Sequence, residues 1–153
     1  MPTLVSDAVD AYVVRRVNAR LQFLLLQRRG DAPFGGSWQA IHARIEPDET
    51  AVTAAERALF AFTGLAPGIV YSADYVNQIF DHARDAVIFI PVLAFEVPAA
   101  AQIALGIDFV QFEWCERDEA AGRLLWSGQR WSVRHIADVI GAGGPTTEFY
   151  RIR

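Results

Sequence analysis

The chain has 153 residues, a formal net charge of −4 and a hydrophobic fraction of 52%. This length suits one domain with its own core, so we expect residues 1–153 to form a single domain. The negative charge offers no basic field to attract a nucleic-acid polymer. No apolar run reaches the ~18 residues of a membrane span, and the N-terminal residues lack a signal-peptide pattern. We therefore expect a cytoplasmic protein without a membrane partner.

Several common kinds of site are excluded by residue type and spacing. Cys115 is the only cysteine, which rules out an internal disulfide and a cysteine-cluster zinc site. The histidines His42, His82 and His135 have no metal-ligand spacing. The glycine pairs lack the pattern of a phosphate loop or dinucleotide fingerprint, and no nucleophile elbow is present.

The first third of the chain predicts a β-hairpin and a loop. Two apolar runs with strand character lie at residues 7–17 and 21–28. Asn18 and Ala19 supply a turn between them. Residues 30–37, GDAPFGGS, are typical of a loop. This loop leads into a strand that starts at Trp38.

The next segment predicts an amphipathic helix. Either Asp48 or Thr50 is a suitable N-cap, and Gly64 supplies the left-handed residue that commonly ends helices. Alanines dominate the segment and favour a helix. The apolar positions with helical spacing are Val52, Ala55, Leu59 and Phe62.

The second half of the chain mixes strands with two helices. Strands are predicted at residues 69–80, 86–97 and 108–114, and helices at 116–124 and 127–140. The nearly continuous apolar character of residues 86–97 predicts a central strand, in which Pro91 marks a bulge or local edge. In the last helix Trp131, His135 and Val139 recur at intervals of four. The tail TTEFYRIR adds an edge strand or lies along the surface.

Residues 38–65 resemble the Nudix box. That pattern has a glutamate, seven intervening residues and an Arg-Glu pair, followed by an aliphatic residue, two further glutamates and a glycine. Laid on the chain without gaps, Glu49, Arg57, Leu59, Gly64 and Leu65 fall on matching positions. The resemblance implies an α/β fold in which a mixed sheet lies between helices, an α/β/α sandwich. Trp126-Ser127 before the last helix also resembles the bacterial Nudix branch that acts on dihydroneopterin triphosphate and dATP.

The departures from the box concern its metal ligands. Ala43 replaces the first glycine, and Ala58, Ala61 and Phe62 replace the helix glutamates. In the family those glutamates hold the divalent ions that bridge the substrate phosphates, and Mg²⁺ requires oxygen ligands. Glu56 does not substitute, because it lies roughly 160° around the helix from position 58.

The resemblance still implies candidate catalytic residues. These are Glu49, Arg57 and Asp108, and the metal candidates are Glu46, Glu49 and Asp108 if the site is active with Mg²⁺ or Mn²⁺. Asp108 falls near a position where several Nudix enzymes keep an additional acidic ligand. Its alternative role is a solvated carboxylate at the start of a strand.

Four residues are candidates for ligand binding: Arg28, Trp38, Gln39 and His42. Arg28 is placed to meet a phosphate, Trp38 and Gln39 to touch a ring, and His42 to act as a base near neutral pH. The alternatives are a surface arginine, a core tryptophan and a hydrogen-bonded structural histidine.

Three functions remain open. The first is a Nudix-fold protein that has lost hydrolysis and binds a small phosphate-containing ligand. The second is an active hydrolase with an altered metal site that cleaves a diphosphate bond by metal-assisted attack of water. The third is an interaction module that contacts a partner, or a second copy of the chain in a homodimer. Its contact surface would consist of the apolar residues Trp126, Trp131, Phe149 and Tyr150.

Overall fold

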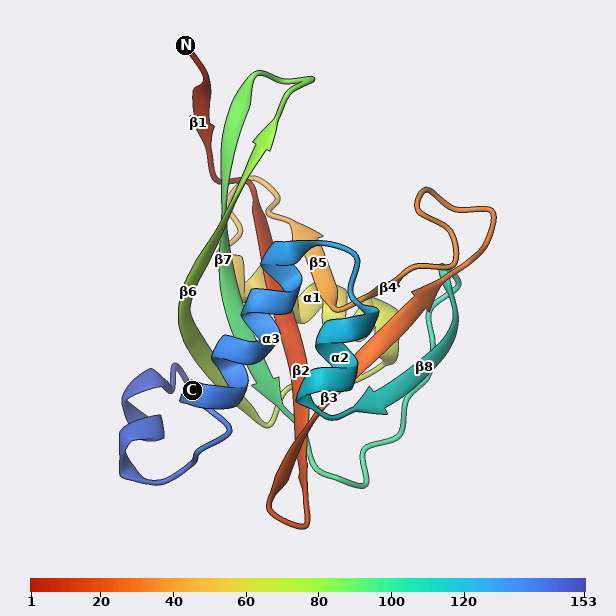
Figure 1. Cartoon of the computed structure of the whole chain (residues 1–153), viewed down its shortest axis with the longest axis vertical. Helices are drawn as coiled ribbons and strands as arrows, with labels where there is room; N and C mark the ends of the chain where they lie inside the picture. Colours follow the sequence, from red (N-terminus) through yellow and green to blue (C-terminus); the bar gives the residue numbers. More distant parts are fainter.

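The computed structural model describes residues 1–153. One mixed sheet of eight strands separates two helical layers, with α2 and α3 in front of it and α1 behind (Figure 1). The strands are β1 Thr3–Val5, β2 Ala8–Val17, β3 Arg20–Arg28, β4 Trp38–Gln39, β5 Ile41–Arg44, β6 Ile69–Asp81, β7 Ala86–Glu96 and β8 Phe109–Cys115. The helices are α1 Ala51–Thr63, α2 Arg117–Arg123, α3 Ser127–Val139 and a 3-10 helix at Pro145–Tyr150. This arrangement confirms the predicted α/β/α sandwich.

Strand pairing places β2 and β7 at the centre of the sheet. They pair in parallel with each other, and β2 also pairs antiparallel with β3 and β5, while β7 pairs with β1 and β6. β8 and β4 both pair with β3. The predicted bulge is confirmed, because the β6 register shifts between Ser72 and Val76, where Val76 lies opposite Pro91.

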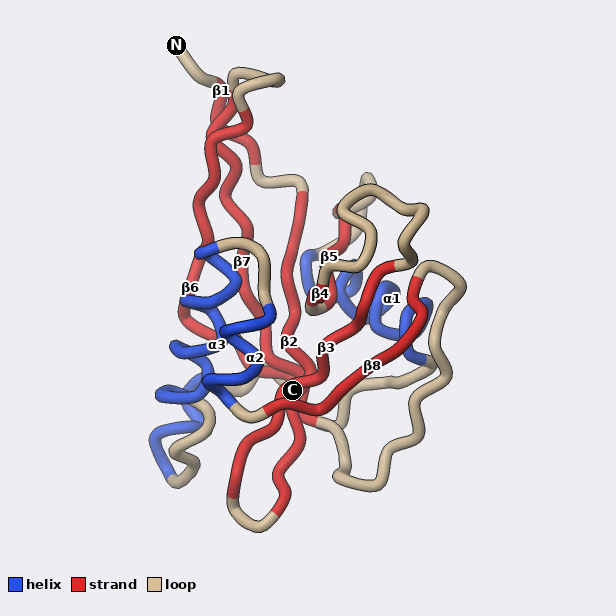
Figure 2. Tube along the Cα trace, turned by 45° about the vertical axis from the view of Figure 1, so that its right-hand side comes forward, coloured by secondary structure: helices blue, strands red, loops and turns tan.

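The helices α1 and α3 lie on opposite faces of the sheet (Figure 2), and each covers a hydrophobic core. Leu59 and the alanines of α1 pack against one face together with Val13, Leu26 and Phe95. Val133 and Ile136 of α3 pack on the other face. No helix is both long and apolar enough to cross a bilayer.

The ends of α1 confirm the predicted caps. The Thr50 hydroxyl accepts a hydrogen bond from the Thr53 N–H at 3.1 Å, and Gly64 ends the helix with φ 72°. The buried face is shifted from the predicted stripe, because Ala54 and Ala58 are buried whereas Val52 and Phe62 lie at its margins.

The buried face of α3 also differs from the apolar spacing in the sequence. Ser132, Val133 and Ile136 are buried, whereas Trp131 is 59% exposed. The C-terminal tail forms a single bridge from Arg151 to Tyr71 on β6. Ile152 donates to the Val70 carbonyl and the Val70 N–H donates to the Arg153 carbonyl, both at 2.7 Å, so the tail pairs with the edge of the sheet over three residues but does not form a full strand.

Candidate functional site

The polar residues of the box are bound to one another. Arg57 donates from Nε to Glu49 Oε1 at 2.8 Å, and its second amino group donates to the Arg44 carbonyl at 2.9 Å. Glu49 Oε2 accepts from the Glu46 backbone N–H at 2.9 Å. The hydrogen bond from Arg57 is the main reason that the pKa of Glu49 is lowered to about 2. This cluster ties the loop before α1 to the helix.

Two of the three positions of the missing glutamates are packed, whereas Ala61 is exposed. Ala58 is 3% exposed within the core, and the Phe62 ring meets Phe109 edge-on with centroids 5.0 Å apart. The loop of residues 98–106 is hydrogen-bonded to this end of α1, because the Gly106 N–H donates to the Phe62 carbonyl at 2.9 Å. A Cβ at Gly106 would lie 2.6 Å from the Ala61 carbonyl oxygen. The neighbouring loop therefore approaches the helix closely at these positions.

Asp108 lies with Arg29 at the start of β8. Its backbone carbonyl accepts from the Arg29 N–H at 3.0 Å, and its negative charge contributes to raising the pKa of Arg29, after the larger effect of Asp31. No three His, Cys, Asp or Glu side chains gather closely enough to hold a metal ion. Glu46, Glu49 and Asp108 thus do not form a three-ligand set in this structure.

All four ligand-binding candidates line one pocket of about 950 Å³ on the α3 face of the sheet. We call it the α3-side pocket. Arg28 enters from the end of β3, Trp38 and Gln39 from β4, and His42 from β5. The pocket also reaches β6, β7 and the N-terminal turn of α3. The structure therefore brings together the residues predicted to touch a ligand.

The floor of the α3-side pocket contains an ion pair. Asp10 and His42 lie directly opposite each other on β2 and β5, and Asp10 Oδ1 is 2.6 Å from His42 Nδ1. Asp10 is only 7% exposed. Its hydrogen bond is the largest influence on His42 and raises the pKa of the imidazole, although burial opposes it. His42 therefore favours its charged form more strongly than a free histidine.

Aromatic side chains form the walls. Phe34 and Trp126 meet edge-on with centroids 5.7 Å apart, and the Arg123 guanidinium lies 5.0 Å from the Trp38 ring centroid. Trp131 lines the same pocket. Such rings suit a flat aromatic ligand.

Arg28 and Gln39 are held in position beside these walls. Arg28 donates to Gln39 Oε1 and to the Pro33 carbonyl, both at 2.8 Å. Arg28 is thus fixed by neighbours on two sides while it lines the pocket.

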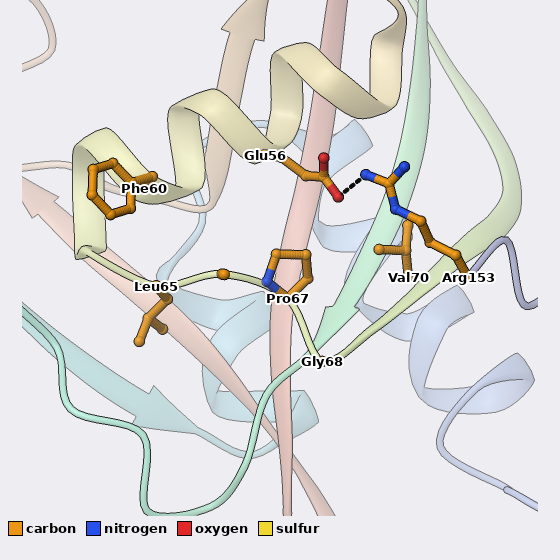
Figure 3. Close-up of a pocket in the computed structure, with 8 residues that line it drawn as sticks. Glu56, Phe60, Leu65, Pro67, Gly68, Val70 and Arg153 are labelled. Atoms are coloured by element: carbon orange, nitrogen blue, oxygen red, sulfur yellow. Dashed lines mark hydrogen bonds and ion pairs between the residues drawn. The ribbon is translucent and has the colours of Figure 1, made fainter.

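A smaller pocket of about 390 Å³ lies beside the outer side of α1. Glu56 and Arg153 point toward one another across it and form an ion pair (Figure 3). Phe60, Leu65 and Pro67 complete much of its wall. It contains none of the candidate ligand, catalytic or metal residues.

A family model described as NUDIX domain matches residues 6–138. The chain belongs to the Nudix family. Its fold is similar to an Ap4A hydrolase from C. elegans, with TM-score 0.74 and 17% identity over 91% of this chain and 99% of that one. It is also similar to the E. coli dihydroneopterin triphosphate pyrophosphohydrolase, with TM-score 0.68 and 18% identity over 83% of this chain and 91% of that one.

Two further similar proteins are a Nudix domain with a bound ligand and a longer transferase. The NUDIX domain of Shewanella oneidensis NrtR, solved with ADP ribose, has TM-score 0.70 and 17% identity, covering 92% of this chain and 89% of that one. An octanoyltransferase from Myxococcus xanthus is 30% identical over 128 residues, which are 82% of this chain and 35% of that protein. The chain therefore spans about a third of the length of this curated relative.

The sequence analysis did not identify several residues of the α3-side pocket. Asp10, Asn77 and Gly128 line it, although each lies far from the box in the chain. Asp10 is the one charged residue among the buried residues 8–14 of β2, and this is a signal that the sequence offers. Its partner His42 becomes visible only from the pairing of β2 with β5. Trp126, considered for protein contacts, lies at the pocket, whereas Phe149 lies beyond the other end of α3.

Proposed function

We propose that this Nudix-family chain binds a small aromatic ligand that carries phosphate, in the α3-side pocket, and that it has lost metal-dependent hydrolysis. The observation that carries the proposal is that the ligand-binding candidates are present together, whereas the metal-binding glutamates are absent. The ligand candidates Arg28, Trp38, Gln39 and His42 share one pocket. The helix positions that would bring metal ions to the phosphates carry alanine and phenylalanine instead.

The pocket has the size and chemistry of a ligand site. Small-molecule pockets occupy roughly 300–1,000 Å³ and combine apolar walls with a few placed polar groups. The α3-side pocket, at about 950 Å³, has Trp38, Trp126 and Trp131 in its wall and the Asp10–His42 pair at its floor. The ligand bound by the NrtR domain, ADP ribose, has the ring and phosphates that such a pocket suits, which supports this ligand class.

The donor set does not fit a bridging Mg²⁺ or Mn²⁺ ion. These ions need several oxygen ligands in near-ideal geometry. Glu49 is held by Arg57 and by the Glu46 N–H, and Asp108 lies beside Arg29. A hydrolase that used Glu46, Glu49 and Asp108 would have to release Glu49 from Arg57 and bring Asp108 to it. Cleavage of a diphosphate bond that requires a metal ion would support this alternative.

The test is ligand-induced stabilisation across a panel of nucleotides, starting with ADP ribose and ADP. A ligand that binds only the folded state at a hundredfold excess over its Kd stabilises by about 2.7 kcal/mol, which a melting experiment detects. We expect a shift in Tm in the presence of EDTA, without cleavage of the diphosphate bond when Mg²⁺ is added.

Two aromatic variants make the test specific for the pocket. Trp126→Ala removes a wall of the α3-side pocket and should reduce the ligand-induced shift. Phe60→Ala removes an exposed aromatic ring, 68% accessible, from the smaller pocket and should leave the shift unchanged. An equal loss in both variants, or no shift with any nucleotide, would reject the proposal.

A second candidate ligand follows from the Myxococcus relative. Because a region similar to this chain forms part of a protein named octanoyltransferase, an acyl group is a second candidate for the aromatic-walled pocket. Titration with octanoate, read by tryptophan fluorescence, tests this candidate. Displacement of a bound nucleotide by octanoate would favour it, and unchanged fluorescence would exclude it.

A further inference from the structure

The N-terminus of α3 opens into the α3-side pocket without a side-chain cap. Its N-cap residue is Trp126, whose indole has no acceptor, whereas Ser, Thr, Asp and Asn are the usual caps. Gln129 Oε1 accepts a hydrogen bond from the Trp126 N–H at 3.1 Å, so the backbone N–H of the N-cap residue has a partner. The N–H groups of Ser127 and Gly128 have no acceptor within α3, and no loop oxygen or side chain caps them.

A second unpaired group, on the sheet, lies beside the first turn of α3. Asn77 on β6 is 8% exposed, lines the pocket, and its side-chain amide makes no hydrogen bond within the protein. The amide is not among the enclosed polar atoms that lack a partner, which are His135 Nε2 and Thr147 Oγ1, so it stays open to the pocket. A ligand atom that enters the pocket can therefore bind it.

Gly128 allows the helix and the amide to meet. A Cβ at this position would lie 2.2 Å from Asn77 Oδ1 and 2.3 Å from Nδ2, so any larger residue would displace the amide. The absence of a side chain leaves the Asn77 amide directly beside the first turn of α3. Backbone and side-chain donors thus converge on one place in the pocket.

The charges at this place favour an anion. The first turn of a helix carries a partial positive charge and forms a common site for phosphate. Asp10 is the only carboxylate lining the pocket, and it is paired with His42. Arg28 adds positive charge on another side of the pocket.

We propose that the phosphate of the ligand binds at the N-terminus of α3, on the N–H groups of Ser127 and Gly128 and the amide of Asn77, without a metal ion. This inference rests on the proposed function and specifies how that pocket holds its ligand.

β5, β2, β7 and β6 are neighbours in that order. Adjacent strands lie about 4.8 Å apart, and Asn77 lies opposite Ile90, two residues from the Val92 that is level with His42, so the backbones of His42 and Asn77 are separated by roughly 16 Å. The ring of a nucleotide then lies toward Trp38 and His42.

The test follows backbone amide resonances by NMR in the presence of EDTA. The full chain is titrated with nucleoside monophosphates, with the matching nucleosides and with inorganic phosphate. The phosphate-bearing compounds should shift the amide resonances of Ser127 and Gly128, and the nucleosides should not. Shifts confined to other residues would overturn the inference.

Two substitutions at Ser127 distinguish the role of its backbone N–H from the role of its side-chain hydroxyl. Ser127→Pro removes the N–H but suits the first helical position, and Trp126 already has the extended backbone (φ −100°, ψ 142°) that precedes proline. Ser127→Ala removes only the hydroxyl. Because hydrogen bonds to charged groups are strong, we expect Ser127→Pro to weaken nucleotide binding about tenfold or more, and Ser127→Ala to weaken it far less.

Asn77→Asp supplies an independent check with a side chain of the same shape. Its carboxylate should repel phosphate and abolish the shifts at Ser127 and Gly128 while the nucleosides bind as before. Nucleotide affinity that is equal in Ser127→Pro, Asn77→Asp and the unaltered protein would overturn the inference and leave the proposed function intact. Shifts with inorganic phosphate but with no nucleotide would instead support the anion site and reject the proposed function.

Discussion

The two faces of the sheet use polar residues differently. On the α1 face, Glu49 and Arg57 bond to each other and to nearby backbone, and the positions around Ala58 and Phe62 are packed. On the α3 face, the amide of Asn77 and the first N–H groups of α3 have no partner and open into a pocket. The polar side chains of the box are therefore bonded to one another, whereas the unpaired polar groups lie on the opposite face.

The largest expected effect contrasts two positions of the box helix. Ala58→Glu places a carboxylate at a site 3% exposed, with no partner, and should lower the free energy of unfolding by about 3 kcal/mol or more. Ala61 is exposed, so Ala61→Glu should change it by only about 0.5 kcal/mol. Urea unfolding measures both. If Ala58→Glu is tolerated and creates Mg²⁺ affinity, the box retains room for metal chemistry and the contrast is wrong.

A second prediction concerns the contact between α3 and β6. Gly128→Ala places a methyl group against the Asn77 amide and should destabilise by about 1 kcal/mol, at the low end of overpacking, because the clashing atoms are the end of a side chain that can move. Combining it with Asn77→Ala should recover part of this loss, because the clashing atoms are removed. A double-mutant cycle from thermal unfolding measures the coupling. Additive effects would show that the two residues do not meet as described.

The third prediction is the titration of His42. Its pKa in the folded protein should lie above 6.5, because of the Asp10 hydrogen bond and the charges of Asp10 and Asp7. A raised pKa means that this stabilisation is complete below pH 6.5 and is lost as the pH rises through the folded-state pKa. NMR of the imidazole measures it, and Asp10→Asn should lower the value. A pKa unchanged by that substitution would contradict the role of Asp10.

The smallest expected effect is on the exposed side of the box. Because Arg57 lowers the pKa of Glu49 to about 2 from 4.5, the ion pair stabilises the fold above pH 4.5 and is lost as the pH falls toward 2. Glu49→Gln should therefore be less stable than the unaltered protein at neutral pH, with a difference that shrinks in acid. Parallel urea unfolding at several pH values tests this, and a constant difference would refute it.

Local patterns predicted most of the fold. Thr50 and Gly64 bound α1 as their cap chemistry requires, and Asn18 and Ala19 both adopt the positive φ of a tight hairpin turn, 51° and 64°. The faces of α1 and α3 were less well predicted, since periodicity alone does not show which apolar side chains remain at a pocket. Trp131 is the clearest example, because it recurs with helical spacing yet is largely exposed.

The candidate site was only partly visible in the sequence. Residues near the box in the chain, from Arg28 to His42, were identified as ligand candidates and do share a pocket. The sequence did not identify Asp10, Asn77 and Gly128. Their roles arise from strand register and from the packing of α3 on β6. Such contacts join segments far apart in the chain and leave no local pattern.

The most direct test compares the affinity of ADP ribose in excess EDTA and in saturating Mg²⁺, with cleavage of its diphosphate bond to AMP and ribose 5-phosphate followed in parallel. The same Kd is expected in both conditions, with no cleavage. Tighter binding that requires Mg²⁺, together with cleavage, would contradict the loss of metal-dependent hydrolysis.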